Sequence, residues 1–538
     1  MSTVVSLVNA CLMASYEGRV PPTWIRRAVE NGLAGVGVFG TNLAPPEPAA
    51  PGAAPYGTLR DDIAAPLRAV RPDVLIALDE EGGDVTRLDY HRGSPYPGNH
   101  ALGAVDDLGL TREVARAIGA DLADAGINLC LGPCADVNSR PNNPIIGVRS
   151  FGADPGRVAR HTEAFVRGLQ DRRVAATLKH FPGHGDTGTD SHTALPDIDR
   201  DLPALRALDL PPFAAGIAAG AKAVMTGHIR LPNLAEPPAT LSPRIVTGLL
   251  REELGYDGVV VSDALEMAPV LDRWGFGGAA VLAWSAGVDL VLLGASGVEH
   301  ALPQVYEAVE SALKKGELTI ERLEEAAARV AALRAWADPV PTGTGRSGSV
   351  PTGTGTGRSG SYTGRSGSVP TGTGTGRSGS YTGRSGIGLV AARRALVAVG
   401  VPSPGASGPV HCVRLSSEAN MAVGVAPWGL DRALDGLGRL ASALDVDPGT
   451  DPADIPLPAA GPLVVVVRDA VRDPWQHTTL DALRTRRPDL VTVDMGLEPA
   501  PGRLAAPLLL TRGAGLANAV AAAELLTGRT WPGPPSGG

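Results

Sequence analysis

Short β-branched runs alternate with helical stretches through the first 338 residues, and this alternation restricts the fold more than any other feature. It is typical of successive βα units around a parallel sheet. Seven runs are predicted to be strands: residues 35–39, 74–79, 127–131, 175–180, 223–228, 258–263 and 289–293. An open doubly wound sheet would alternate similarly. The absence of a glycine-rich nucleotide fingerprint favours a closed (β/α)8 barrel of the TIM type.

A tandem repeat follows this region. The run RSGSVPTGTGTGRSGSYTG at 346–364 returns unchanged at 365–383 and has no apolar periodicity. Because such a composition cannot bury a core, residues 339–386 are predicted to be a disordered Gly/Ser/Thr-rich linker. The linker separates a catalytic barrel at 1–338 from a smaller domain at 387–538. That domain is predicted to be an α/β/α sandwich with strands at 410–415, 463–468, 490–494 and 508–511 and a helix at 516–526.

Composition narrows the classes of partner and the compartment. A formal charge of −8 argues against a nucleic-acid partner, which would need a basic face. No apolar run is long enough to predict a membrane span. The amino terminus, MSTVVSLVNACLMASYEGRV, has no basic n-region and no small-residue cleavage site, so a cytoplasmic location is expected. The oligomeric state is not predicted.

Polar residues cluster where the predicted strands end. They are Asp79, Asp136, Lys179 with His180, His228 and Asp263. The carboxyl ends of the strands carry the active site in barrels of this kind, so these side chains are expected to converge there.

The segment 179–192, KHFPGHGDTGTDSH, is the densest in chemically active side chains. His180 and His184 have a spacing that puts two metal ligands on one face of a helix, but Pro182 and Gly183 exclude a helix here. A zinc site built on loop geometry, and hence a metallohydrolase, stays open as an alternative. His192 comes two residues after Asp190, and a carboxylate beside an imidazole makes a general acid/base.

Asp263 ends an apolar strand in the run GYDGVVVSDALEM at 255–267. A carboxylate at a barrel strand end suits the nucleophile of a retaining glycosidase, which forms a covalent glycosyl-enzyme intermediate. An Asp in this position is also a common N-cap of the following helix. The strand pattern alone does not decide between the two.

Five runs together resemble glycoside hydrolase family 3, and more narrowly its bacterial β-N-acetylglucosaminidase branch. They are EEGGDVTR at 80–87, GPCADVNSRPNNPIIGVRSFG at 132–152, KHFPGHGDTGTDSH, PATLS at 238–242 and GYDGVVVSDALEM. The runs cover nearly the whole first domain in the family's order. The second domain resembles the family's sandwich domain more weakly, through GAGLANAVAAAELLTGRTWPG.

The resemblance implies a role for particular residues. Asp263 matches the catalytic nucleophile, and His192 with Asp190 matches the acid/base dyad of this branch. The residues that match those holding the terminal sugar's hydroxyls are Asp79, Arg87, Arg149, Lys179 and His180. Carboxylates accept hydrogen bonds from hydroxyls, and Arg and Lys donate to sugar oxygens.

Two positions depart from the family pattern. The family commonly has DQEGGRV where this chain has DEEGGDV, so Glu80 replaces an amide and Asp84 replaces a basic residue. Both changes are expected to make the rim of the pocket more acidic and so to alter the preference for the aglycone.

The sequence therefore predicts a retaining exo-β-N-acetylhexosaminidase that removes terminal β-N-acetylglucosamine without a metal or organic cofactor. By analogy with the family, and because no signal peptide is evident, peptidoglycan recycling fragments of the muropeptide type or imported chitin oligosaccharides are the expected substrates. The nearest alternative is a phosphorylase, because an imidazole acid/base does not repel an incoming phosphate as a carboxylate would. A β-glucosidase and a catalytically silent sugar-binding module are the remaining alternatives.

Overall fold

The computed structural model describes residues 3–43, 56–189, 194–294, 297–337, 385–401, 408–417, 422–424 and 426–532. The described residues outside 339–382 belong to one compact unit. The predicted linker at 339–386 lies almost wholly outside the described residues. None of the described helices is both long and apolar enough to cross a membrane.

Eight strands form the first sheet, and every neighbouring pair in it is parallel. They are β1 (Leu12–Ala14), β2 (Gly35–Gly37), β3 (Leu75–Leu78), β6 (Leu129–Cys130), β7 (Ala175–Phe181), β8 (Ala223–Thr226), β9 (Val259–Ser262) and β10 (Val291–Leu293). The order is β10-β1-β2-β3-β6-β7-β8-β9. A bridge between Val261 and Leu290 joins the two ends, so the sheet is a barrel, as predicted.

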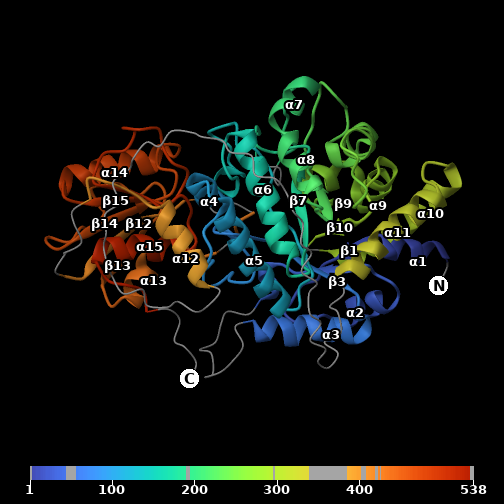
Figure 1. Ribbon diagram of the computed structural model, residues 1–538, viewed down its shortest axis with the longest axis horizontal. Helices are drawn as coiled ribbons and strands as arrows, with labels where there is room; N and C mark the ends of the chain where they lie inside the picture. Colours follow the sequence, from blue (N-terminus) through green and yellow to red (C-terminus); the bar gives the residue numbers. More distant parts are fainter. Residues whose placement is uncertain are drawn as a thin grey trace, which may run out of the picture. The chain divides into compact units, whose positions relative to one another are not determined.

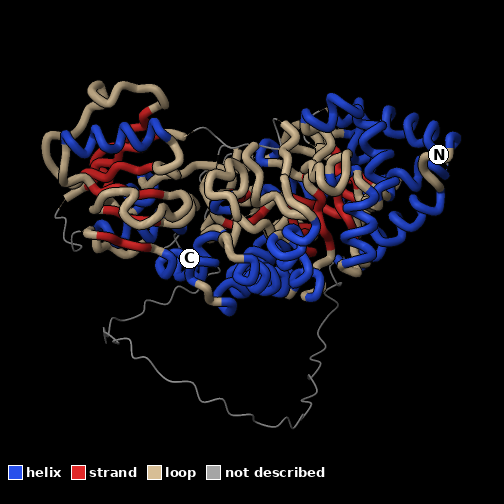
Figure 2. Tube along the Cα trace, turned by 90° about the horizontal axis from the view of Figure 1, so that it is seen from above, coloured by secondary structure: helices blue, strands red, loops and turns tan. Residues whose placement is uncertain are grey.

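Helices surround the barrel strands (Figures 1 and 2). They are α1 (Thr3–Ala10), α2 (Thr23–Glu30), α3 (Ala65–Val70), α4 (Asn99–Val105), α5 (Leu108–Asp124), α6 (Pro155–Gln170), α7 (Leu202–Leu208), α8 (Leu210–Ala218), α9 (Ala268–Ala286), α10 (Val298–Lys315) and α11 (Ile320–Ala337), together with other helical segments such as η5 (Arg244–Glu253). Several begin at an aspartate: the side chains of Asp107, Asp154 and Asp201 accept hydrogen bonds from backbone N–H groups in the first turns of α5, α6 and α7.

The strands alternate between two cores because their side chains have a period of two. Leu75 and Ala77 of β3 face the barrel interior, whereas Ile76 and Leu78 pack into the larger core under the helices. The interior cluster also contains Val330, Leu333 and Ala337 of α11. The ring of Trp336, in the same helix, makes cation–π contacts with Arg173 and Lys222, which precede β7 and β8. Helix α11 therefore covers the amino ends of the strands and leaves the carboxyl ends for chemistry.

The C-terminal domain is a second α/β unit with a six-stranded sheet of order β11-β16-β15-β14-β12-β13. Its elements are α12 (Ser385–Ala395), β11 (Val397–Val399), β12 (Val410–Leu415), α13 (Asp431–Gly436), β13 (Leu440–Val446), β14 (Leu463–Val467), α14 (Pro474–Arg486), β15 (Val491–Asp494), β16 (Leu508–Leu510) and α15 (Leu516–Thr527). Only the pair β11–β16 is antiparallel. The four predicted strands and the predicted helix are present, so the predicted sandwich domain is confirmed.

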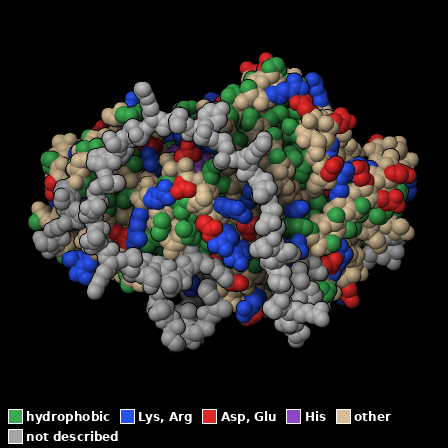
Figure 3. Space-filling model, in the orientation of Figure 1, with side chains coloured by type: hydrophobic (Ala, Val, Ile, Leu, Met, Phe, Trp, Pro, Cys, Tyr) green, Lys and Arg blue, Asp and Glu red, His purple; other side chains and the backbone are tan. Residues whose placement is uncertain are grey.

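Charged side chains of both signs are interspersed over the described residues on the face shown in Figure 3. Among them, Lys and Arg side chains commonly lie beside Asp and Glu side chains. This mixture fits the many exposed ion pairs of the helices, such as Arg116 with Glu113 and Arg206 with Glu253.

Candidate active site

A buried charged cluster lies at the carboxyl ends of β3 and β7. Lys179 Nζ, in β7, donates to Asp79 Oδ1 at 2.6 Å and lies 2.8 Å from Glu81 Oε1. The exposed fraction of the side chain is 3% for Lys179 but 20% for Asp79. Asp79 thus forms the accessible edge of the cluster. Burial opposes ionisation of Asp79, but the charges of Lys179 and Arg87 outweigh it and hold the pKa of its carboxyl below the usual range.

Arg149 completes the cluster from the loop after β6. Its Nε and Nη2 donate to the two carboxylate oxygens of Glu81 at 3.0 and 2.8 Å, and its Nη1 donates to the carbonyl of Ile145 at 3.1 Å. Burial opposes ionisation of Glu81, but Arg149 and Lys179 together lower its pKa to about 2. Glu81 therefore stays charged near neutral pH and fixes both cations.

His180 is oriented by Asp136, which lies in the loop after β6. Its Nδ1 is 2.8 Å from Asp136 Oδ2, and its backbone N–H and that of His184 donate to Asp136 Oδ1 at 3.1 and 2.7 Å. Burial opposes ionisation of Asp136, but the charge and hydrogen bond of His180 hold the pKa of its carboxyl below the usual range. With Asp136 on Nδ1, the Nε2 edge of His180 is the one left for a ligand.

The zinc alternative rested on His180 and His184. Burial and the neighbouring charge of His180 lower the pKa of His184 to about 4, and its Nδ1 is 2.8 Å from Thr187 Oγ1. Across the part of the chain that the structure describes, no group of three or more His, Cys, Asp or Glu side chains is arranged to hold a metal ion.

Asp263 follows β9 directly and is partly exposed. Its backbone N–H donates to Thr226 O at 3.1 Å, and its Oδ1 accepts from Ala264 N at 2.9 Å. Helix α9 begins at Ala268 with Met267 as its N-cap. The alternative reading of Asp263 as the cap of the next helix is therefore wrong, and this carboxylate stands at a strand end without that structural duty.

His228 is a buried neighbour of this strand end. Its Nε2 lies 3.1 Å from Ala264 O, and its Nδ1 lies 3.0 Å from Thr240 Oγ1. A carbonyl oxygen only accepts, so Nε2 carries a proton in this arrangement. His228 thereby braces the backbone immediately after Asp263.

Asp190 and His192, the predicted acid/base dyad, lie outside the described residues. The flanking segments are described on both sides: Asn143 Nδ2 donates to His184 O at 2.9 Å, and Ile198 N donates to Arg230 O at 3.0 Å. The described segments on either side of residues 190–193 are thus attached to neighbouring barrel loops.

Arg87 follows a hairpin made of β4 (Glu80–Gly82) and β5 (Val85–Thr86). Its Nη2 lies 4.0 Å from Asp79 Oδ2. The same guanidinium donates to the carbonyls of Ala422 and Val423 in the C-terminal domain at 2.7 and 3.2 Å. The C-terminal domain therefore reaches a predicted sugar-binding residue of the barrel.

Two residues that organise the site were not among the predicted site residues. Glu81 and Asp136 hold Lys179, Arg149 and His180. The sequence indicates Asp136 only by its place beyond a strand, and Glu81 only as part of the run EEGGDVTR. The available signal was charge balance, because a buried lysine and arginine at strand ends need carboxylate partners.

The expectation of a more acidic pocket rim is wrong. Glu80 is 1% exposed, and its Oε2 accepts from Thr86 Oγ1, Arg87 N and Leu88 N at 2.8, 3.0 and 3.1 Å. Asp84 is 5% exposed and pairs with Arg468 of the C-terminal domain. Both carboxyls make contacts inside the protein: Glu80 closes the hairpin, and Asp84 joins the barrel to the C-terminal domain.

Glu80→Gln is expected to stabilise the protein increasingly as pH rises. Burial raises the pKa of Glu80 from 4.5 to about 8, so between these values the folded state binds more protons than the unfolded state. The stability from protonated Glu80 is complete below pH 4.5 and is lost as pH rises through 8. Glutamine does not titrate, so the variant should gain up to about 1.4 kcal/mol per pH unit over this window.

Urea unfolding at pH 5 and pH 8 measures this difference, with Glu252→Gln, at an exposed position, as the matched control. A difference between Glu80→Gln and wild type that stays constant over the window would contradict the buried, protonated state of Glu80.

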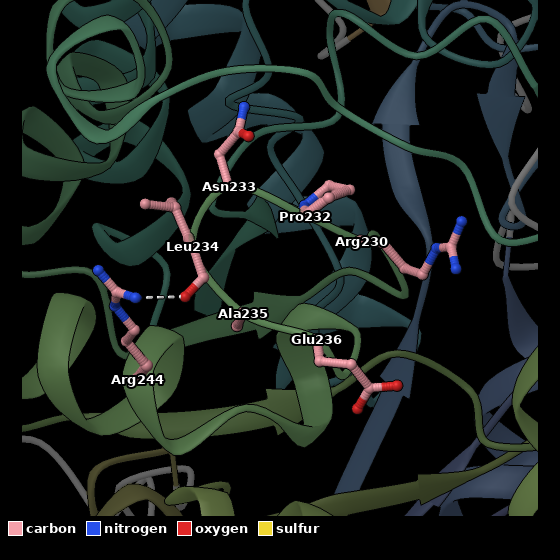
Figure 4. A pocket seen from close by; sticks show the side chains of 7 residues that line it. All are labelled: Arg230, Pro232, Asn233, Leu234, Ala235, Glu236 and Arg244. Atoms are coloured by element: carbon pink, nitrogen blue, oxygen red, sulfur yellow. Dashed lines mark hydrogen bonds between the residues drawn. The ribbon is translucent and has the colours of Figure 1, made fainter.

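A cavity of about 470 Å³ lies on the loop after β8. Figure 4 shows its lining residues: Arg230, Pro232, Asn233, Leu234, Ala235, Glu236 and Arg244. None of the predicted site residues lines it. Arg230 is paired with Asp197, and Arg244 donates to Leu234 O at 2.6 Å. Because both cations already have partners, this cavity is not assigned as the active site.

The fold is a parallel barrel with a buried charged cluster at the carboxyl ends of β3 and β7, the end at which barrel enzymes carry their active sites. Residues 29–333 match the family model described as the glycosyl hydrolase family 3 N-terminal domain. The chain is 40% identical over 282 residues to β-hexosaminidase A of Pseudoalteromonas piscicida, with 48% of this chain and 47% of that protein covered. It is 41% identical over 238 residues to the β-hexosaminidase of Stenotrophomonas maltophilia, with 43% and 70% covered.

Solved structures are similar as well. The family 3 β-N-acetylglucosaminidase of Paenibacillus sp. has 29% identity and a TM-score of 0.78, with 99% of both chains covered. The β-N-acetylhexosaminidase of Beutenbergia cavernae has 30% identity and a TM-score of 0.54, with 62% of this chain and 99% of that chain covered. The chain belongs to glycosyl hydrolase family 3. The prediction of a glycoside hydrolase is confirmed. The chain spans about half the length of the Pseudoalteromonas relative.

Proposed function

We propose that the protein is a retaining exo-β-N-acetylhexosaminidase that releases terminal β-linked N-acetylglucosamine. The observation that carries this proposal is that a partly exposed carboxylate, Asp263, and a buried charged cluster lie at the same end of the barrel. Strands β7, β8 and β9 are neighbours in the sheet, so Lys179 and Asp263 stand only two strands apart. The names of the curated relatives support the substrate class.

The proposed reaction has two displacements. Asp263 attacks the anomeric carbon while His192 protonates the leaving oxygen, which gives a covalent glycosyl-enzyme. The same imidazole then takes a proton from water, which attacks the anomeric carbon and restores the β configuration. Asp190 orients and charges the imidazole. Asp79 accepts hydrogen bonds from sugar hydroxyls. The other residues that bind the terminal sugar, or position the side chains that bind it, are Arg87, Arg149, Lys179 and His180.

Water is the proposed acceptor. The relatives are named hexosaminidases and N-acetylglucosaminidases, and these comparisons do not support the phosphorylase alternative. Incubation in phosphate buffer, followed by mass spectrometry for N-acetylglucosamine 1-phosphate, separates the two acceptors. Free N-acetylglucosamine as the only sugar product is the expected result.

The proposed natural substrates are muropeptide-type cell-wall fragments or chitin oligosaccharides, and the proposed compartment is the cytoplasm. The hydroxyl-binding cluster would bind only the terminal sugar, because the leaving sugar would extend beyond it. The cluster therefore does not distinguish the two classes of substrate. Comparison of kcat/KM on chitobiose and on a GlcNAc-anhydro-muramyl peptide ranks the two classes.

Turnover of aryl glycosides tests the function directly. Wild-type protein should release aryl alcohol from an aryl β-N-acetylglucosaminide at least about 10²-fold faster than from the matching β-glucoside, because a site that hydrogen-bonds a substrate amide discriminates strongly against its loss. Proton NMR of the first-formed sugar should show the β anomer. Equal rates on both glycosides, or the α anomer as first product, would refute the proposal.

A further inference from the structure

The carboxylate of Asp84 is held on both oxygens by the C-terminal domain. Arg468 pairs with Oδ2, and the backbone N–H of Ala514 donates to Oδ1 at 2.7 Å. The Asp84 side chain is 2% exposed. Hydrogen bonds to a charged group are stronger than neutral ones, and the low dielectric of a buried site strengthens them further. Asp84 therefore anchors the barrel hairpin on the C-terminal domain.

Contacts within the C-terminal domain fix the position of Arg468. Arg468 follows β14, its backbone N–H donates to the buried Gln476 Oε1 at 2.9 Å, and its guanidinium lies 5.9 Å from the ring of Trp428. Ala514 immediately precedes the N-terminus of α15, where the helix dipole also favours a carboxylate. The carboxyl edge of the second sheet is thus arranged to receive one negative charge.

The anchored hairpin connects two predicted sugar-binding residues. Asp79 lies just before β4, and Arg87 lies just after β5. The hairpin is closed internally by Glu80, and the guanidinium of Arg87 is taken up by the carbonyls of Ala422 and Val423. Two independent sets of contacts from the C-terminal domain, one on Asp84 and one on Arg87, therefore converge on the same short segment.

We propose that Asp84 and Arg468 are positioning residues that set Arg87 for the terminal sugar, so that the C-terminal domain tunes substrate binding by the barrel without supplying a reacting group. This inference rests on the proposed function, because it takes Arg87 to hold the sugar. The C-terminal domain then has a defined role in substrate binding. The β-N-acetylhexosaminidase of Beutenbergia cavernae matches only 62% of this chain with 99% of its own length, so not every similar enzyme needs a counterpart to the whole of this chain.

Arg468→Gln in the full chain is the first test. Without Arg468, Asp84 keeps only the Ala514 N–H, so the hairpin is held less firmly and Arg87 is positioned less strictly in both the ground state and the transition state. KM for the aryl N-acetylglucosaminide should therefore rise about tenfold with kcat nearly unchanged. A purely structural role would instead lower the active fraction, and hence kcat, at constant KM. Hydrogen exchange at residues 80–88 should become faster in the variant.

Charge reversal and a second interdomain pair make the test specific. Asp84→Arg alone should raise KM as Arg468→Gln does, and combining it with Arg468→Asp should recover part of the loss. Arg394→Gln removes another pair between the domains, with Asp107 at 2.7 Å, and should leave KM and the exchange of 80–88 unchanged.

The outcomes separate the inference from the function. Unchanged KM in Arg468→Gln, with or without faster exchange, overturns the positioning role while the hydrolase stands. An equal rise of KM in Arg394→Gln overturns it too, because loosened docking in general would then be the cause. Wild-type protein that turns over no N-acetylglucosaminide overturns the proposed function and this inference together.

Discussion

Asp263→Asn is expected to lower kcat on an aryl β-N-acetylglucosaminide by at least about 10³-fold, the range typical of losing a residue that bonds to the substrate. An amide at this position keeps the size of the side chain but cannot form the glycosyl-enzyme. Asn is as good as Asp at capping helices, so a capping role would predict full activity from the same variant. Stopped assays of aryl alcohol release, with the concentration of active sites measured from the burst phase, give kcat directly.

The matched control is Asp257→Asn, because Asp257 is exposed and lies just ahead of the same strand. It should retain wild-type kcat. Asp263→Ala supplies a second readout: azide added to this variant should enter the vacated space and yield the α-glycosyl azide. An Asp263→Asn variant with near wild-type kcat would place the nucleophile elsewhere.

Lys179→Met is expected to weaken both folding and catalysis. Removing one partner of a buried charge pair leaves the other uncompensated, at a cost of about 3 to 5 kcal/mol in the free energy of unfolding. Asp79 would lose its 2.6 Å partner, and Glu81 would keep only Arg149. Loss of a charged hydrogen bond to the sugar, or to Asp79 that binds it, should lower kcat/KM by about 10²-fold. Calorimetric unfolding and aryl glycoside kinetics measure the two effects.

Lys315→Met, at the exposed end of α10, is the control for the loss of one lysine charge and should change neither quantity. Asp79→Asn combined with Lys179→Met should destabilise by less than the sum of the single variants, because the pair is removed together. Strict additivity would show that Asp79 and Lys179 do not interact energetically.

The sequence predicted seven of the eight barrel strands because their short β-branched runs alternate with helical stretches. The strand that it did not reveal, β1, has three residues inside an apolar stretch that also contains α1, so periodicity could not separate them. In the C-terminal domain the edge strands β11 and β13 were missed for another reason. They are mostly exposed, and the mixed residues of Leu440–Val446 carry no buried-strand pattern.

The candidate site was predictable where a side chain follows a strand and hidden where the fold supplies a partner. Lys179, His180, Asp79 and Asp263 stand out by position. The role of Asp84 depends on Arg468, which is 384 residues away. Nothing in the local sequence distinguishes a carboxylate on a pocket rim from one that joins two domains, so the burial of Asp84 could not be predicted.

Closure of the barrel by its first strand also has a consequence for biosynthesis. Leu12 pairs with Val291, so β1 has no partner on that side until nearly 280 further residues have been synthesised. At usual elongation rates the delay is roughly 14 to 56 seconds. During this time the nascent chain carries an open parallel sheet edge, the kind of surface that promotes aggregation. Ribosome-associated chaperones are therefore expected to hold this chain from its first βα units until β10 emerges.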